Sequence, residues 1–267
     1  MKNAIAYQGG KRAMEQKRTL AVDIGGSGVK VMVLDETGTP ITERHRVKTP
    51  QPATPEPIIE AIATLATEVG EFDRVSVGFP GVVIRGVVKT AVNLHPEWHE
   101  VDLATILEEK LGKPVRVAND ADIQGLGAIS GKGIELAITL GTGFGTALFV
   151  DGVLVPNLEV AHHRFRKKKT YEELLGRAAL EEYGRKKWNK RLKKAIASLQ
   201  HLFNYERIYI GGGETENITF ELPDNAKIVP NVLGLLGGIK LWENYPVPPV
   251  NPVEDEVPKE LSTRKEE

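Results

Sequence analysis

The sequence predicts an α/β protein of two related halves with a central cleft between them. A glycine-rich turn joins two strand-like runs at residues 23–28, and the same device recurs at residues 141–145. Around these turns, segments with helical spacing of apolar residues alternate with short apolar runs that are typical of strands. Because the two turns lie about half a chain apart, we expect each to belong to one half and to face the cleft.

The composition sets the limits within which the elements are interpreted. Of the 267 residues, 41% are hydrophobic and 27% are charged, which is usual for a soluble globular protein, and the formal net charge is −1. No apolar run approaches the ~20 residues of a membrane helix, and the N-terminus lacks the apolar segment of a secretory signal. The absence of cysteine excludes disulfide bonds and cysteine-ligated zinc. We therefore expect a cytoplasmic protein with no membrane partner.

The chain divides into four predicted parts. Residues 1–17 and 246–267 lack periodicity or are rich in proline and charge, and both are expected to be flexible. Residues 18–117 are expected to form an N-terminal α/β domain, and residues 118–245 a C-terminal one.

The first element is a strand, Leu20 to Val22, which enters the turn at Asp23–Gly28 and leaves as a second strand, Val29 to Leu34. A dinucleotide fingerprint needs a helix after its glycines. Here Val29, Val31 and Val33 alternate as a strand does, which excludes that interpretation, and no P-loop pattern is present. What remains is a hairpin, either an ordinary tight one or one whose backbone N–H groups and serine hydroxyl face phosphate.

The second hairpin repeats the first. A strand enters Gly141-Thr142-Gly143-Phe144-Gly145, a strand leaves it, and Asp151-Gly152 turns the chain into a third strand. The remaining elements follow in order. Helices are predicted at 56–69, at 102–111, in two pieces broken near Gly184 within 170–204, and at 235–244; strands are predicted at 74–79, 115–118 and 207–210.

Four motifs stand in a specific order: Asp-x-Gly-Gly-Ser at 23–27, Asn-Asp at 119–120, Gly-Thr-Gly-x-Gly at 141–145 and Gly-Gly-Gly at 211–213. This order resembles the ROK family of sugar kinases, within the actin-like (ribonuclease-H-like) ATPase superfamily, over roughly residues 18–245. The polyphosphate glucokinases of that family are the most similar, since residues 79–81, Asn93 and 157–162 also match them.

The resemblance implies an actin-like fold and roles for individual residues. A hexose hydroxyl needs a base to withdraw its proton, and Asp120 matches the family's catalytic base for the 6-hydroxyl of glucose. The implied sugar contacts are Asn93, Asn119, Asp120, Glu159 and His162. The implied phosphate and nucleotide contacts are Asp23, Gly25, Gly26, Ser27, Lys30, Gly141, Thr142, Gly143, Gly211, Gly212 and Gly213. Asp23 is the tentative ligand of Mg²⁺, the cofactor that phosphoryl transfer calls for.

Two positions depart from the family pattern. The family's cysteine-rich zinc site is absent, so no zinc is expected. Arg164 stands where many polyphosphate glucokinases carry a second glutamate after the sugar histidine, and His163 or a residue elsewhere is needed in its place.

A basic run follows the sugar segment, at Arg164, Arg166, Lys167, Lys168 and Lys169. Three interpretations stay open: a solvated loop, a nucleic-acid patch, and a guide that leads the anionic donor into the cleft through Arg166 and Lys167–Lys169. The nucleic-acid interpretation is disfavoured because no aromatic platform or reading helix accompanies the run.

The leading functional hypothesis is a glucokinase that uses inorganic polyphosphate, ATP or both to make glucose 6-phosphate. The alternatives are a strictly ATP-dependent glucokinase or other hexose kinase, and a catalytically inactive sugar-binding protein. Only about 18 residues precede the first strand, too few for the DNA-binding domain of the family's repressors. The resemblance also implies a homodimer, and a last helix that packs back on the N-terminal domain.

Overall fold

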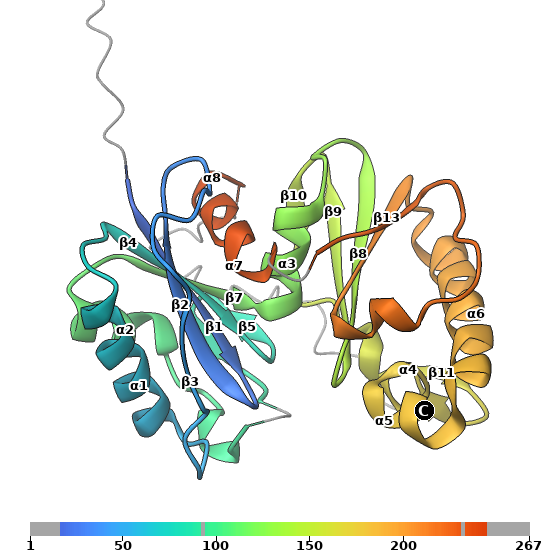
Figure 1. Cartoon of the computed structure of the whole chain (residues 1–267), viewed down its shortest axis with the longest axis horizontal. Coiled ribbons are helices and arrows are strands. Elements are labelled where there is room, and N and C mark those ends of the chain that lie inside the picture. The colour runs from blue at the N-terminus through green and yellow to red at the C-terminus, as the bar shows by residue number, and fades with distance from the viewer. Residues whose placement is uncertain (1–16, 92–93, 231–232, 245–267) are drawn as a thin grey trace, which may run out of the picture.

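The computed structural model describes residues 17–91, 94–230 and 233–244. Figure 1 shows two lobes, each built on a twisted sheet, with short helices between them. Each sheet has five strands. Two α/β halves were predicted, and the structure confirms them. The predicted flexible ends, apart from residue 17, lie outside the described residues.

The first sheet has the strand order β3-β2-β1-β4-β7. Its central hairpin is antiparallel, whereas β4 and β7 add in parallel, so the sheet is mixed. Its strands are β1 (Thr19–Gly25), β2 (Gly28–Leu34), β3 (His45–Val47), β4 (Arg74–Phe79) and β7 (Val115–Asn119).

Two helices, α1 (Pro55–Glu68) and α2 (Leu103–Leu111), cover one face of this sheet. The predicted spacing is confirmed, because Ile58, Ile62 and Leu65 of α1 are buried in the core. The α2 helix begins as expected: the Asp102 carboxylate caps it by accepting from the Thr105 N–H. Three small elements link the helices and strands of this lobe: β5 (Val83–Ile84), β6 (Val87–Val88) and the 3₁₀ turn η1 (Pro96–Trp98).

The second sheet repeats the design with the order β10-β9-β8-β13-β14. Its central hairpin, β8–β9, is again antiparallel. On the other side of β8, β13 and then β14 add in parallel. Its strands are β8 (Ile134–Leu140), β9 (Phe144–Val150), β10 (Val153–Val155), β13 (Arg207–Gly211) and β14 (Ala226–Ile228). The repeated hairpin therefore occupies the same place in both sheets.

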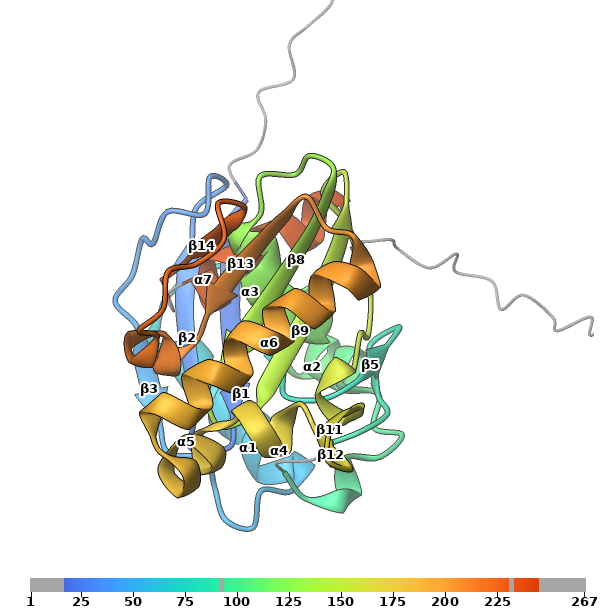
Figure 2. The same cartoon turned by 90° about the vertical axis from the view of Figure 1, so that its right-hand side faces the viewer.

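Figure 2 shows α6 (Arg185–Phe203) lying across the outer face of the second sheet. Two short helices, α4 (Glu172–Leu175) and α5 (Arg177–Tyr183), precede it. The predicted break at Gly184 is confirmed. The structure adds a second break at Gly176, so three helices stand where two were predicted.

Smaller elements occupy the loops of this lobe: the 3₁₀ turns η2 (Val160–His162) and η3 (Gly213–Asn217), and the hairpin of β11 (Arg164–Arg166) and β12 (Lys169–Thr170). Within the described residues, no helix is both long and apolar enough to cross a membrane.

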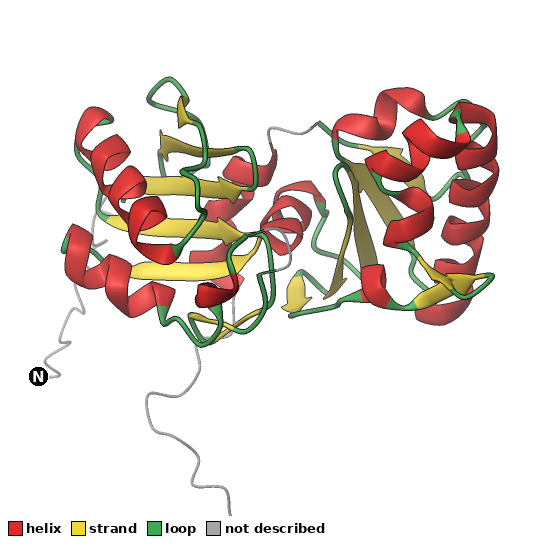
Figure 3. Ribbon diagram, turned by 90° about the horizontal axis from the view of Figure 1, so that it is seen from below, coloured by secondary structure: helices red, strands yellow, loops and turns green. Residues whose placement is uncertain are grey.

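Helix α3 (Asp120–Ala128) lies between the sheets, in the centre of Figure 1, and packs against both β8 and β4. The C-terminal segment returns to it as α7 (Leu233–Leu236), η4 (Gly237–Lys240) and α8 (Leu241–Asn244). Seen from below, helices flank both sheets (Figure 3).

The strands of the first sheet end at residue 119, and those of the second lie within 134–228. Leu235 and Ile239 then pack on Ala21, Met32 and Leu34 of the first sheet. The C-terminal segment thus packs on the N-terminal half, while the exact domain limits stay a prediction.

Candidate active site

A cleft of about 680 Å³ lies where the glycine turns of the two lobes face each other. Each turn lines the cleft because it joins the two strands of the central hairpin at the edge of the sheet that faces the other lobe. Most of the predicted site residues line it: Asp23, Gly25, Gly26, Ser27, Lys30, Asn119, Asp120, Gly141, Thr142, Gly143, Glu159, His162, Gly212 and Gly213. Segments that are up to 190 residues apart in the sequence (23 and 213) therefore form one site.

The turn of the first lobe joins β1 to β2, with Gly25 paired to Gly28 across the hairpin. Beside it, the Lys30 ammonium donates to the Asp23 carboxylate at 2.6 Å, and both side chains are partly buried. Lys30, a predicted phosphate contact, lines the cleft and is paired with Asp23 there. Asp23 is thus a fixed carboxylate next to the first glycine turn.

The turn of the second lobe runs through Gly141, Thr142 and Gly143. The start of α5 supports it, because the Arg177 N–H donates to the Gly141 carbonyl at 2.9 Å. On the other side, the Phe144 N–H donates to the Glu172 carboxylate at 3.3 Å. Helices α4 and α5 therefore hold this turn in place.

The third glycine run ends β13. Gly211 is the last residue of the strand and is buried, whereas Gly212 and Gly213 line the cleft. At Gly212 the backbone φ is +96°, and an added Cβ would lie 2.1 Å from the Leu140 carbonyl oxygen. Only glycine fits a left-handed backbone pressed against a neighbouring strand in this way.

Asp120 is the first residue of α3 and opens onto the cleft. Its surface is accessible from the cleft, yet the surrounding walls limit its hydration. Burial, and then the nearby charge of Asp23, raise the pKa of Asp120 to about 7, while the Ala121 N–H opposes the shift and Glu159 adds to it. A carboxyl group with this pKa can exchange a proton near neutral pH.

The Asn119 side chain is already engaged by the protein. Its carbonyl oxygen caps α3 by accepting from the Ala121 N–H at 2.8 Å, and its amide donates to the Gly81 carbonyl at 3.1 Å. Asn119 therefore fixes the position of Asp120 and ties α3 to the loop after β4, in addition to lining the cleft.

The predicted sugar segment forms η2 at the opposite wall. The Glu159 carboxylate lies 3.4 Å from His162 Nε2, and both side chains are accessible from the cleft. Burial is the main cause that raises the pKa of Glu159; His162 opposes the shift and Glu172 adds to it. The segment is anchored by the Thr146 hydroxyl, which donates to the Leu158 carbonyl at 2.6 Å.

Sequence reasoning missed several residues that line the same cleft: Thr90, Gln124, Thr139, Glu172 and Arg177. Glu172 matters most, because it adds a carboxylate beside Glu159. Arg164, where the family pattern led us to look, is an exposed strand residue outside the cleft lining. Glu172 was not recognisable from sequence, because it follows His162 by ten residues. The β11–β12 hairpin in between returns the chain to the cleft.

Arg177 also reaches the third glycine run. Its Nε donates to the Glu214 carboxylate at 2.6 Å, and half of its side chain remains exposed. Arg177 therefore lines the cleft between the second and third glycine runs as one partner of an ion pair.

Two predicted features lie elsewhere. Asn93 falls outside the described residues. The basic run forms the β11–β12 hairpin, with Lys167 and Lys168 at its tip in left-handed conformations and exposed. None of Arg166, Lys167, Lys168 or Lys169 lines the cleft, although the hairpin begins two residues after His162. The run is an ordered hairpin rather than an irregular loop.

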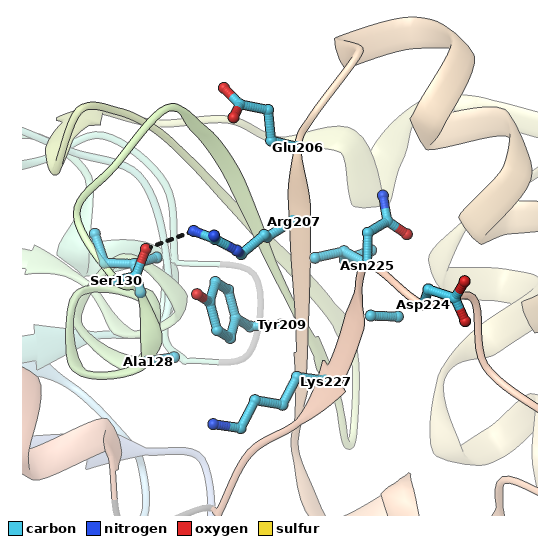
Figure 4. Close-up of a pocket in the computed structure, with 11 residues that line it drawn as sticks. Ala128, Ser130, Glu206, Arg207, Tyr209, Asp224, Asn225 and Lys227 are labelled. Atoms are coloured by element: carbon cyan, nitrogen blue, oxygen red, sulfur yellow. Dashed lines mark hydrogen bonds between the residues drawn. The ribbon is translucent and has the colours of Figure 1, made fainter.

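A second hollow, of about 700 Å³, lies at the far end of the second lobe (Figure 4). Its floor is structural: the Tyr209 hydroxyl and the Ser130 N–H donate to the buried Glu135 carboxylate at 2.8 Å and 3.0 Å. Figure 4 also shows Arg207 reaching Ser130. This hollow contains none of the glycine runs, so the chemistry belongs to the cleft between the lobes.

A metal at the cleft would depend on few protein ligands. Among the described residues, no group of three or more His, Asp or Glu side chains could hold a metal ion by itself. Mg²⁺ in phosphoryl-transfer sites is usually held by one or two carboxylates together with substrate phosphates. The single Asp23 carboxylate beside the phosphate-facing turns fits that type of site.

The comparisons with known proteins agree with this geometry. Residues 19–157 match the model of the ROK family. The polyphosphate glucokinase of Mycobacterium tuberculosis is 31% identical in an alignment of 239 positions that covers 85% of this chain and 90% of the mycobacterial protein.

The chain belongs to the ROK family. It is a sugar kinase of that family by its similarity to such kinases over most of its length.

Solved structures extend the match to the fold. The inorganic polyphosphate/ATP-glucomannokinase of Arthrobacter sp. strain KM superposes with a TM-score of 0.75, at 34% identity, over 84% of this chain and 97% of that one. A ROK glucokinase of Streptomyces griseus, solved with glucose and AMPPNP, has a TM-score of 0.71 at 22% identity, over 84% of this chain and 98% of that one. The predicted actin-like fold is thereby confirmed.

Proposed function

We propose that this ROK kinase is a glucokinase that transfers a phosphoryl group from inorganic polyphosphate, ATP or both to the 6-hydroxyl of glucose. The observation that carries the proposal is the place of Asp120. A carboxyl group whose pKa is about 7 lies between two glycine-rich turns and a wall of hydrogen-bonding side chains. A phosphoryl donor and a polyol acceptor can therefore meet at a base.

In this proposal Asp120 removes the proton of the 6-hydroxyl as the hydroxyl oxygen attacks the terminal phosphorus. The bond from phosphorus to the donor's bridging oxygen breaks, and the shortened donor leaves. Because the base must be ionised, its pKa near neutrality balances proton affinity against the fraction that is ready to react. Asn119 positions the base through the cap on α3.

Glu159, His162 and Glu172 are the proposed sugar contacts, with Asn93 and Asn119. Carboxylates accept hydrogen bonds from sugar hydroxyls, and the imidazole donates to or accepts from them. Glu172 supplies the carboxylate that the sequence lacks at Arg164, because it lies beside Glu159 and supports the second turn.

Backbone N–H groups of the three glycine runs are the proposed phosphate contacts, together with the Ser27 and Thr142 hydroxyls. Arg177 and Lys30 add positive charge, which phosphoryl transfer requires where charge spreads over the phosphoryl oxygens. Mg²⁺ bound with Asp23 would neutralise donor phosphates, and Lys30 would then share that carboxylate.

The identity of the donor is the finer part of the proposal. Similarity to a polyphosphate glucokinase and to a polyphosphate/ATP-glucomannokinase supports polyphosphate. The Gly211–Gly213 run at the cleft edge supports a nucleotide and keeps a strictly ATP-dependent hexose kinase as the second candidate. Homodimer assembly and guidance of polyphosphate by the β11–β12 hairpin belong to the same proposal.

A coupled assay for glucose 6-phosphate, run separately with ATP and with polyphosphate, tests the proposal. We expect product with polyphosphate, and a rate that depends on Mg²⁺. Product with ATP alone would select the second candidate. No product with either donor would overturn the glucokinase proposal.

A further inference from the structure

The first half of α6 carries an unusual concentration of positive charge. Seven of the ten residues from Arg185 to Lys194 are Lys or Arg, and no Asp or Glu occurs anywhere in the helix, although the whole chain has a net charge of −1. Solvated helices normally mix both signs. This one therefore differs from the rest of the molecule.

These cations form one stripe. Trp188, Leu192 and Ile196 turn inward onto the second sheet. At 100° per residue, the remaining surface of the helix carries six cations, of which five are exposed and Arg191, at the edge of the band, is half-buried: Lys186, Lys187, Lys190, Arg191, Lys193 and Lys194. From Lys186 to Lys194 the band, called here the α6 stripe, is about 12 Å long.

The stripe is not neutralised by the protein. None of its six cations forms an ion pair with a carboxylate within the described ranges. Arg191 lies 3.9 Å and Lys187 4.4 Å from the centre of the Tyr183 ring, so an aromatic face rather than an acid holds them. Lys169 of the β11–β12 hairpin meets the same residue, donating to the Tyr183 hydroxyl at 3.0 Å. Glu173 and Glu182 act on Lys169 only at longer range.

This arrangement weakens the helix itself. Like charges four residues apart, as in Lys186–Lys190 and Lys190–Lys194, destabilise a helix. Cations in the first turns also oppose the helix dipole. The charges of the α6 stripe lower the stability of the helix in both ways, which indicates that they have a role outside folding.

The stripe connects to the donor end of the cleft. The Arg185 guanidinium donates to the Glu216 and Asn217 carbonyls at 2.9 Å and 3.0 Å, which fixes the start of α6 to η3. The η3 turn follows directly from Gly212 and Gly213 at the cleft edge. On the other side, α5 runs from Arg177 at the cleft to Tyr183 at the stripe, about 9 Å along its axis. Both routes link the glycine runs of the cleft to the stripe. The η3 turn carries Glu214 and Glu216, of which Glu214 is paired with Arg177, and α5 carries Glu181 and Glu182.

We propose that the α6 stripe, with Lys169, is a docking surface for the distal phosphates of long-chain inorganic polyphosphate whose terminal phosphate occupies the cleft. This inference rests on the proposed use of polyphosphate as a donor. A linear polyanion is the partner that fits, because the stripe carries six cations and no carboxylate on its helix, and it adjoins α5 and η3, which lead to the cleft. ATP ends within the cleft and would not reach it.

The test compares a variant of the stripe with a matched variant elsewhere. Lys186→Gln/Lys190→Gln/Lys194→Gln removes three charges while keeping a good helix former at each position. Lys113→Gln/Lys132→Gln/Lys227→Gln removes three exposed cations that likewise form no ion pair. The triple change to Arg at 186, 190 and 194 keeps the charge.

Binding of long-chain polyphosphate is measured directly as a function of salt. For the stripe variant we expect the Kd to rise by at least about tenfold, and the slope of log K against log salt to fall by about 2, since three phosphate contacts are lost. The matched variant and the Arg variant should bind like the wild-type protein. Binding of tripolyphosphate, and the kcat and KM with ATP, should stay unchanged in all of them, which also shows that each is folded.

Equal losses in the stripe variant and the matched variant would overturn the proposal, as would single-stranded DNA that binds the stripe as tightly as polyphosphate at the same salt. Binding through the stripe without glucose 6-phosphate formation from polyphosphate would leave the docking surface standing. That result would remove only the proposed donor, so the two failures are distinguishable.

Discussion

At the scale of single residues, the start of α3 concentrates three carboxyl or amide side chains with different tasks. Asn119 caps the helix, Asp120 opens to the cleft, and Asp122 is buried. Burial, with the charges of Asp120 and Glu159 nearby, raises the pKa of Asp122 well above its usual value, while the Asn157 N–H opposes the shift. Its Oδ1 meets no donor or acceptor in the described part of the chain. Burial therefore favours the neutral acid of Asp122 over its carboxylate in the folded protein.

This protonation predicts a pH-dependent effect of Asp122→Asn. In the folded protein Asp122 keeps its proton, whereas in the unfolded chain it ionises above about pH 4. Unfolding therefore releases a proton, and rising pH destabilises the wild-type protein through this group until the folded-state pKa is reached. The neutral amide lacks this contribution.

Urea unfolding of both proteins between about pH 5 and 8 measures the difference. At the low end of this range, the free energy of unfolding of Asp122→Asn should be lower than that of the wild-type protein by no more than about 1 kcal/mol. As pH rises, the free energy of unfolding of the variant should increase relative to that of the wild-type protein. A difference that stays constant or moves the other way would show that Asp122 is ionised in the folded state.

Sequence reasoning reached Asp120, Glu159 and His162 because they stand in short motifs, and the structure brings them together in one cleft. It did not reach Glu172 or Asp122. Their roles come from tertiary neighbours, namely the Phe144 N–H for Glu172 and the core around α3 for Asp122. No local pattern encodes such neighbours.

At the scale of elements, the β11–β12 hairpin separates the sugar segment from α4. The stacking of Phe165 on Tyr171, with ring centres 4.5 Å apart, and the register of the two strands keep the hairpin ordered. Its tip then presents Lys167 and Lys168 to solvent. The composition alone could not distinguish a flexible loop from a hairpin, because the two strands are only three and two residues long and consist mostly of charged residues.

We expect Lys167→Gln/Lys168→Gln to raise the KM for polyphosphate several-fold and to leave the KM for ATP within about twofold, since only a long polyanion would meet the tip on its way to the cleft. Steady-state kinetics with both donors at two salt concentrations measure this. A parallel rise for both donors would contradict guidance by the hairpin and indicate a disturbed sugar segment instead.

Elements of strong periodicity, such as α1 and α2, were predicted nearly to the residue. The segment 170–204 was not, because the break at Gly176 depends on tertiary contact. An added Cβ at Gly176 would lie 2.8 Å from the Thr142 carbonyl oxygen of the second turn. The helix is therefore interrupted at Gly176, where the backbone lies against the second glycine turn, and α5 begins at the next residue.

At the scale of the whole molecule, the two lobes are joined through α3 and the returning C-terminal segment. Backbone meets backbone at this junction, because a Cβ added at Gly237 would lie 1.9 Å from the Ile123 carbonyl oxygen and 2.8 Å from the Gly127 nitrogen. The Ser76 hydroxyl donates to the neighbouring Gly238 carbonyl at 2.7 Å. The lobes, and hence the two faces of the cleft, are positioned by this close packing.

Gly237→Ala should therefore cost about 1–3 kcal/mol, the range for overpacking a tight contact. Gly78→Ala is the matched control, since a Cβ there meets only ordinary contacts, the nearest at 3.5 Å, and should cost less than about 1 kcal/mol. The free energy of unfolding in urea decides between them. Equal costs for both variants would mean that η4 can shift away from α3 without loss.

The order of the glycine turns was enough to predict two halves, and the repeated sheet design bears this out. The path of the C-terminal segment required the structure in detail, because the sequence does not show which elements its apolar residues, such as Leu235 and Ile239, pack against. Its glycines also act through contacts 110 residues away in the sequence (237 and 127). Long-range packing of this kind leaves little trace in a local pattern.

The central claim is that Asp120 is the base of a glucokinase, and Asp120→Asn tests it most directly. With wild-type protein, kcat/KM for glucose should rise with pH through about 7, because the base must lose its proton to act. The variant should turn over at least ~100-fold more slowly with every donor that the wild-type protein uses, show no such rise, and still bind glucose with nearly the same Kd. A folded variant that retains the wild-type rate would contradict the account.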